Sequence, residues 1–131
     1  MANNYRWEAE FYEDTNGVSD VGQELNRIAR SDVRGIRTIR NKIDLLRQQS
    51  LAEALQSKLI KRPSKHLYVL KVQSGPVSYR LPFFESPCRT PLIVFVSVEH
   101  RRDLGGDNYA ELVDEAERLR LDWIARNCGG K

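Results

Sequence analysis

The sequence lacks the features that would place it in a membrane or among zinc proteins. No apolar run approaches the roughly 20 residues that cross a bilayer, and the N-terminal stretch has no basic-then-apolar signal layout. We therefore expect a cytoplasmic protein with no membrane partner. The two cysteines, Cys88 and Cys128, fall in no CxxC or Cys/His spacing, so we expect no metal. Two ordinary thiols are favoured, with one disulfide as the alternative.

The composition is that of one folded, mildly basic unit. The chain has 131 residues, 40% of them hydrophobic, which is enough for one packed core, and we expect a single domain over residues 1–131. Net charge is +3 and the isoelectric point is about 9.0. This is compatible with nucleic-acid binding, and the position of the charges matters more than their sum.

The first half predicts a strand followed by helices. Tyr5–Tyr12 alternates as a strand does. Ser19 or Asp20 is suited to cap one helix, and Ser31-Asp32 to cap a second one with an apolar stripe at helical spacing. A short helical stretch is expected over Leu51–Ile60, before Pro63 closes the helical region.

The second half predicts three strands and a last helix. The strands are expected over His66–Gln73, Val77–Glu85 and Pro91–Glu99, and their short links require antiparallel neighbours. Asp107 is suited to cap a helix whose buried stripe includes Trp123. The fold class is therefore α+β: a small antiparallel-rich four-stranded sheet, an N-terminal helical hairpin and a C-terminal helix, in the order β-α-α-β-β-β-α.

Two cations are predicted to lie opposite one another in the sheet. If Gly75-Pro76 are the central residues of a tight hairpin, counting back from the turn places Lys71 directly across from Arg80. Both would point away from the main core. Like charges directly opposite destabilise a sheet unless an anion lies beside them, and a phosphate would satisfy both.

The exit of the third strand adds further cations. Residues His100, Arg101 and Arg102 are expected to arrive near Lys71 and Arg80. Histidine exchanges a proton near neutral pH, and arginine holds a phosphate with paired donors. This is the chemistry by which a ribose 2′-hydroxyl attacks its own phosphodiester. The same residues also fit a structural ion network in which Glu99 pairs with Arg80.

On these segments the sequence resembles the RelE/ParE toxin superfamily, particularly its HigB-like members. The resemblance runs through KLIKRPSKHLYVLKVQSGPVSYRLPFF, LIVFVSVEHRRD and DEAERLRLDW. It implies that Lys71, Arg80, His100 and Arg101 are catalytic. We expect Lys61, Lys65, Arg89 and Arg102 to bind RNA. Lys71 stands where the family usually has arginine, and His100-Arg101 where it usually has two lysines.

The resemblance implies a function and partners. Members of this superfamily typically cut messenger RNA on the ribosome, with no metal or organic cofactor, and a cognate antitoxin protein blocks the basic site. Two alternatives stay open: a ParE-like gyrase poison, which needs no proton-transfer group, and a non-catalytic nucleic-acid-binding accessory protein of a phage or mobile element.

Overall fold

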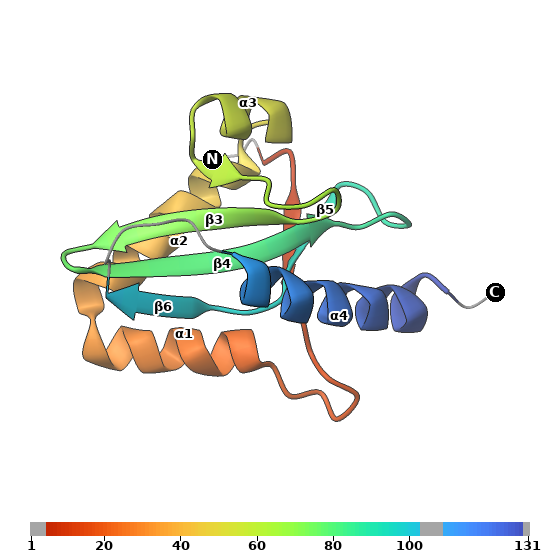
Figure 1. The fold of residues 1–131 in the computed structure, drawn as a ribbon, viewed down its shortest axis with the longest axis horizontal. Helices are drawn as coiled ribbons and strands as arrows, with labels where there is room; N and C mark the ends of the chain where they lie inside the picture. Colours follow the sequence, from red (N-terminus) through yellow and green to blue (C-terminus); the bar gives the residue numbers. More distant parts are fainter. Residues whose placement is uncertain (1–4, 103–108, 130–131) are drawn as a thin grey trace.

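A computed structural model describes residues 5–102 and 109–129, with the side chains of Arg101 and Arg102 excepted. Its helices and strands follow one another as a strand, three helices, five strands and a final helix (Figure 1). Their bounds are β1 (Glu8–Phe11), α1 (Asp20–Ser31), α2 (Val33–Arg47), α3 (Leu51–Gln56), β2 (Ile60–Lys61), β3 (Tyr68–Ser74), β4 (Val77–Glu85), β5 (Leu92–Phe95), β6 (Glu99–Arg102) and α4 (Ala110–Asn127).

The sheet confirms the α+β prediction and contains more strands than expected. Its order is β1-β5-β4-β3-β2, with β6 also paired to β4, and all pairs are antiparallel except β1 with β5. The additional strands are the two-residue β2 and β6; the expected third strand ends early, as β5, and β6 begins at Glu99, its expected last residue. The expected cap Asp107 lies outside the described residues.

The gap between β5 and β6 lies opposite Pro82. The amide of Val96 donates to the Pro82 carbonyl at 3.0 Å, so this carbonyl faces the β5/β6 side of β4. In an antiparallel pair the N–H and C=O of one residue face the same neighbour, and proline has no N–H to give. The ladder therefore lacks a bond there: β5 pairs with Phe83–Glu85 and β6 with Val77–Arg80.

The sheet is covered on both faces. The helical hairpin of α1 and α2 buries Ile39 and Leu46 against Leu70, Leu81 and Phe83 on one face. On the other face, α4 crosses the sheet (Figure 1). This alternation along β3 and β4 is the one that the sequence predicted.

Trp123 anchors α4, as the helical stripe predicted. Its side chain is 3% exposed and meets Phe84 of β4 edge-on, with ring centroids 5.5 Å apart.

Among the described residues no helix is both long and apolar enough to cross a membrane.

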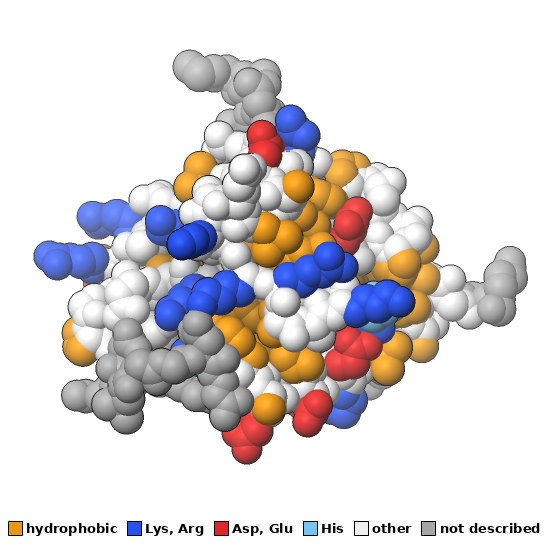
Figure 2. All heavy atoms as spheres, turned by 45° about the horizontal axis from the view of Figure 1, so that its top comes forward, with side chains coloured by type: hydrophobic (Ala, Val, Ile, Leu, Met, Phe, Trp, Pro, Cys, Tyr) orange, Lys and Arg blue, Asp and Glu red, His pale blue; other side chains and the backbone are white. Residues whose placement is uncertain are grey.

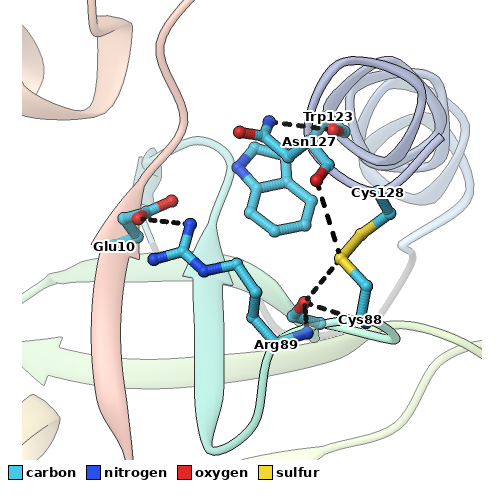
Figure 3. The surroundings of a disulfide bond; sticks show 7 residues. Glu10, Cys88, Arg89, Trp123, Asn127 and Cys128 are labelled. Atoms are coloured by element: carbon cyan, nitrogen blue, oxygen red, sulfur yellow. Dashed lines mark hydrogen bonds and ion pairs between the residues drawn. A yellow bond between two sulfur atoms is a disulfide. The ribbon is translucent and has the colours of Figure 1, made fainter. Parts of the chain in front are cut away.

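The two cysteines form a disulfide, which corrects the expectation of ordinary thiols. Cys88 lies in the β4–β5 loop and Cys128 follows α4, with Cα atoms 5.6 Å apart (Figure 3). The fold brings together two positions 40 residues apart in sequence, and no local motif reports such a distance. Because disulfides persist mainly in oxidising compartments, this pair does not favour the expected cytoplasmic location.

Removing the disulfide should lower the free energy of unfolding by roughly 3–4 kcal/mol, because the bond closes a long loop in the unfolded chain. Urea unfolding of the oxidised protein and of the double variant Cys88→Ser, Cys128→Ser measures this. A reducing agent should shift the parent curve onto that of the variant and leave the variant unchanged. Superimposable parent and variant curves would contradict the prediction.

Asp32 ties the β3–β4 hairpin to the helical hairpin. Its carboxylate caps α2 by accepting from the amide of Gly35 at 2.9 Å, and a Cβ at Gly35 would collide with it. The same carboxylate accepts from the hydroxyls of Tyr79 at 2.7 Å and Ser74 at 3.0 Å. The hydrogen bond from Tyr79 has the largest effect on the pKa of Asp32 and lowers it below its ordinary value of 3.8. The hydrogen bond from Gly35 lowers it further. Burial, and to a lesser extent the hydrogen bond to Asp32, raises the pKa of Tyr79 to about 12. Its hydroxyl therefore remains a donor.

Asp32→Asn should lower the free energy of unfolding by about 2 kcal/mol at neutral pH, because an amide cannot accept hydrogen bonds at both of its ends. The contribution of a carboxylate with a lowered pKa is complete above its unfolded pKa. It is lost as pH falls through the folded value. Parent and variant should therefore converge below pH 3.8. Denaturation across this pH range is the measurement, and Asp44→Asn, an exposed control, should change little.

Candidate functional site

The predicted pairing of Lys71 with Arg80 is confirmed. The two residues are Cα partners in the β3–β4 ladder, and Ser74 pairs with Val77 across the turn at Gly75-Pro76. Gly75 has φ +58°, which glycine adopts without strain. Directly paired residues share a face of the sheet, so both cations belong to the face that α4 covers.

An acid continues this row of charges. Glu99 of β6 is the Cα partner of Arg80 on the side of β4 opposite to Lys71. The register thus lays Lys71, Arg80 and Glu99 side by side across three strands on one face. The central Arg80 therefore has a like charge on one side and an opposite charge on the other, as the ion-network alternative anticipates.

Arg80 is buried, whereas from the sequence we expected it to be available to a phosphate. Its side chain is 3% exposed, and the ring of Tyr109 lies over its guanidinium carbon at 4.8 Å. β4 is a central strand, and Tyr109 and Leu112 at the start of α4 pack on Val69 beside it. A guanidinium under an aromatic face is stabilised by the ring quadrupole. Access to Arg80 therefore requires the start of α4 to move.

His100 lies on the other face of the sheet, which corrects the expectation that it joins Lys71 and Arg80. It is the Cα partner of Tyr79, with ring centroids 6.1 Å apart, and its Nε2 lies 3.6 Å from a carboxylate oxygen of Glu24 in α1. Successive side chains of a strand alternate between faces, so the pairing of Glu99 with Arg80 necessarily turns His100 away.

The other predicted cations are dispersed. The backbones of Arg101 and Arg102 pair with Ser78 and Val77, while their side chains lie outside the described part of the structure. Arg89 belongs to the β4–β5 loop beside the disulfide, 3.6 Å from Glu10 (Figure 3). The five residues from Arg80 to the end of β4 already span about 17 Å. The structure therefore does not bring Arg89 together with Lys71 and Arg80.

Lys61 and Lys65 lie at the β2 side of the sheet. Lys61 pairs with Val69, and Lys65 lies in the loop before β3; both are exposed. Figure 2 brings the α3 and β2 side of the molecule forward and shows Lys and Arg side chains across the middle of this face, with acidic ones mainly at its margins. Lys61 and Lys65 on this surface are accessible, whereas Arg80 is buried.

Two pockets are lined in part by residues of the loop between β2 and β3. One of about 370 Å³ lies beside Tyr109 and is lined by Pro63, Tyr109, Ala110, Val113 and Asp114. Another of about 230 Å³ is lined by Arg62, Lys65, His66, Tyr68, Glu85, Pro87 and Arg120. Of these residues the sequence prediction included only Lys65. The run of cations directly before Tyr68 is the sequence signal that could have indicated Arg62 and His66.

No group of three or more metal-ligating side chains is placed to hold a metal ion within residues 5–102 and 109–129. The sequence matches no model of a known protein family and no curated protein.

Tyr109→Ala should expose Arg80, because this ring lies over its guanidinium. Phenylglyoxal modification followed by peptide mass spectrometry should find Arg80 slow to react in the parent and at least about tenfold faster in the variant. Arg118, whose side chain is 65% exposed, should react alike in both and serves as the internal control. Equal rates at Arg80 would mean that other groups exclude the reagent.

Proposed function

We propose that this protein is the toxin of a type II toxin–antitoxin pair, a metal-independent endoribonuclease that cuts messenger RNA on the ribosome. The observation that carries the proposal is the cross-strand pair of Lys71 and Arg80. Two adjacent cations on one sheet face are matched to a phosphodiester, whose negative charge grows during cleavage. The sequence resemblance and the α+β arrangement support the same interpretation.

The proposed reaction uses the 2′-hydroxyl of the RNA itself. Its oxygen bonds to phosphorus and the bond from phosphorus to the 5′-oxygen breaks, while water accepts the proton of the nucleophile and supplies one to the leaving oxygen. The products are a 2′,3′-cyclic phosphate and a 5′-hydroxyl. Arg80 and Lys71 hold the phosphate, with Arg101 as a further cation. His100 takes no step, because it lies across the sheet beside Glu24.

The burial of Arg80 sets a requirement for this reaction. Tyr109 must leave the guanidinium of Arg80 before RNA reaches it. An antitoxin that covers the same face of the sheet would block the site. The toxin and its antitoxin would act in the cytoplasm, where ribosomes are found, although the disulfide is more typical of oxidising compartments. A binding-only nucleic-acid protein is the second candidate, and the burial of Arg80 and the separation of His100 favour it.

Lys71→Gln should reduce single-turnover cleavage of a ribosome-bound messenger by about 10²–10³-fold, because it removes one charge that stabilises the transition state. Lys71 is only half-buried, so its loss threatens the fold less than that of Arg80. Arg118→Gln removes an equal charge from the exposed side of α4 and should leave the rate unchanged, as should His100→Gln. Thermal unfolding of each variant checks the fold.

The outcomes separate the candidates. Cleavage by the parent that survives Lys71→Gln would remove the Lys71 and Arg80 pair from the mechanism. RNA binding by the parent without cleavage would favour the binding-only function, and gyrase inhibition without cleavage would favour a gyrase poison.

A further inference from the structure

The 230 Å³ pocket lies where four segments meet, away from the covered face of Arg80. It is lined by Arg62, Lys65 and His66 from the β2–β3 loop, Tyr68 from the start of β3, Glu85 and Pro87 from the end of β4 and the following loop, and Arg120 from α4. Arg62, Lys65 and His66 are all exposed. A ligand reaches this pocket without any movement of α4.

The pocket has a stacked, fixed floor. Tyr68 stacks on Phe83 with ring centroids 5.4 Å apart and planes inclined by 21°. The guanidinium carbon of Arg62 lies 5.4 Å from the Tyr68 centroid, and its Nη2 donates to the carbonyl of Lys65 at 2.6 Å. These contacts hold a planar cation over an aromatic ring before any ligand arrives. Nucleobases stack on both kinds of surface.

The charges of the pocket are unequal. Arg120 is bound to Glu117 of its own helix, with Nε 3.0 Å from one carboxylate oxygen and 3.1 Å from the other. The hydrogen bond from Arg120 lowers the pKa of Glu117, and His66 lowers it further. Arg120 is therefore largely neutralised by Glu117. Arg62 and Lys65 remain as cations, and the acid beside them among the described lining residues is Glu85.

This combination matches one nucleotide better than a bare anion. Arg62 and Lys65 supply donors for a phosphate, and the stacked floor supplies a surface for a base. The carboxylate of Glu85 repels a second phosphate and accepts a hydrogen bond from an amino group on a base edge, as acids do with cytosine. A protein ligand with acidic side chains would leave the aromatic floor unused.

The pocket is close to the cation pair along β3. Tyr68 and Lys71 are three residues apart, about 10 Å along an extended strand, and their side chains belong to opposite faces of the sheet. Between them on the neighbouring strand, exposed Lys61 pairs with Val69, whose side chain shares the face of Lys71. A short single strand of nucleic acid held in the pocket therefore reaches Lys71 over the β2 edge.

We propose that this pocket binds one nucleotide of single-stranded RNA next to the bond that is cut, with its phosphate on Arg62 and Lys65 and its base stacked over Arg62 and Tyr68. The position relative to the cut rests on the proposed function. The binding of single-stranded RNA does not.

The test measures binding of a short fluorescein-labelled single-stranded RNA by fluorescence anisotropy over a range of salt concentrations. The double variant Arg62→Gln, Lys65→Gln should weaken binding about tenfold or more and reduce the salt slope by about 0.7 for each phosphate that it no longer neutralises. The control, Arg37→Gln with Arg40→Gln, removes two exposed arginines from α2 and should leave affinity and slope within about twofold. Equal weakening in both double variants would reduce the pocket to general electrostatic attraction and overturn the proposal.

The base-stacking part has its own measurement. Tyr68→Leu should weaken RNA binding by about tenfold, and Tyr68→Phe, which keeps the ring, should bind like the parent. Adenosine monophosphate should displace the labelled RNA at a lower concentration than inorganic phosphate. Equal displacement by the two competitors, or equal binding by both Tyr68 variants, would overturn the nucleotide assignment.

Binding and cleavage fail separately. If the parent binds RNA through the pocket and cuts none, the pocket stands and the toxin proposal fails. If the parent cuts RNA and the pocket variants bind and cut as it does, the toxin proposal stands and the pocket fails.

Discussion

The alternation of side chains along β4 is the constraint on which the rest of the structure depends. β4 runs from Val77 to Glu85 and is buried at every position between Ser78 and Phe84. Tyr79, Leu81 and Phe83 hold the helical hairpin on one face, while Phe84 receives Trp123 of α4 on the other. A shift of one residue in this strand would exchange both sets and place Arg80 in the main core.

Two links hold the ends of the hairpin that β3 and β4 form. At the turn end, Asp32 receives the hydroxyls of Ser74 and Tyr79 and caps α2 with the same carboxylate. At the other end, the disulfide from Cys88 to Cys128 joins the loop after β4 to the end of α4. The first link fixes β3 and β4 against the helical hairpin, and the second fixes the loop after β4 against the end of α4.

The sequence was sufficient where structure is local. The two-residue turn at Gly75-Pro76 determines that Lys71 faces Arg80, and side-chain parity then determines the face. Asp32 is recognisable as a cap for the same reason. The face of the sheet on which His100 lies could not be predicted in this way. It depends on where β6 begins after the gap opposite Pro82. The cover of Tyr109 over Arg80 and the disulfide depend on how α4 crosses the sheet, which no local pattern records.

The covered cation pair and the open pocket suggest an order of events. The contact of Tyr109 with Arg80 is worth about 2 kcal/mol when it is shielded from water. A hydrogen bond between a guanidinium and a phosphate contributes about 1.5–3 kcal/mol, and a bidentate pair has two. Exchange of the ring for a phosphate is thus favourable only for a phosphate already held nearby, because a free strand also loses its translational freedom on binding. Binding in the pocket at Arg62 and Tyr68 would restrict the strand first, before Arg80 is uncovered. Arg80 would then remain shielded from phosphates that lack an adjoining nucleotide, so its burial under Tyr109 is compatible with a selective role in cleavage.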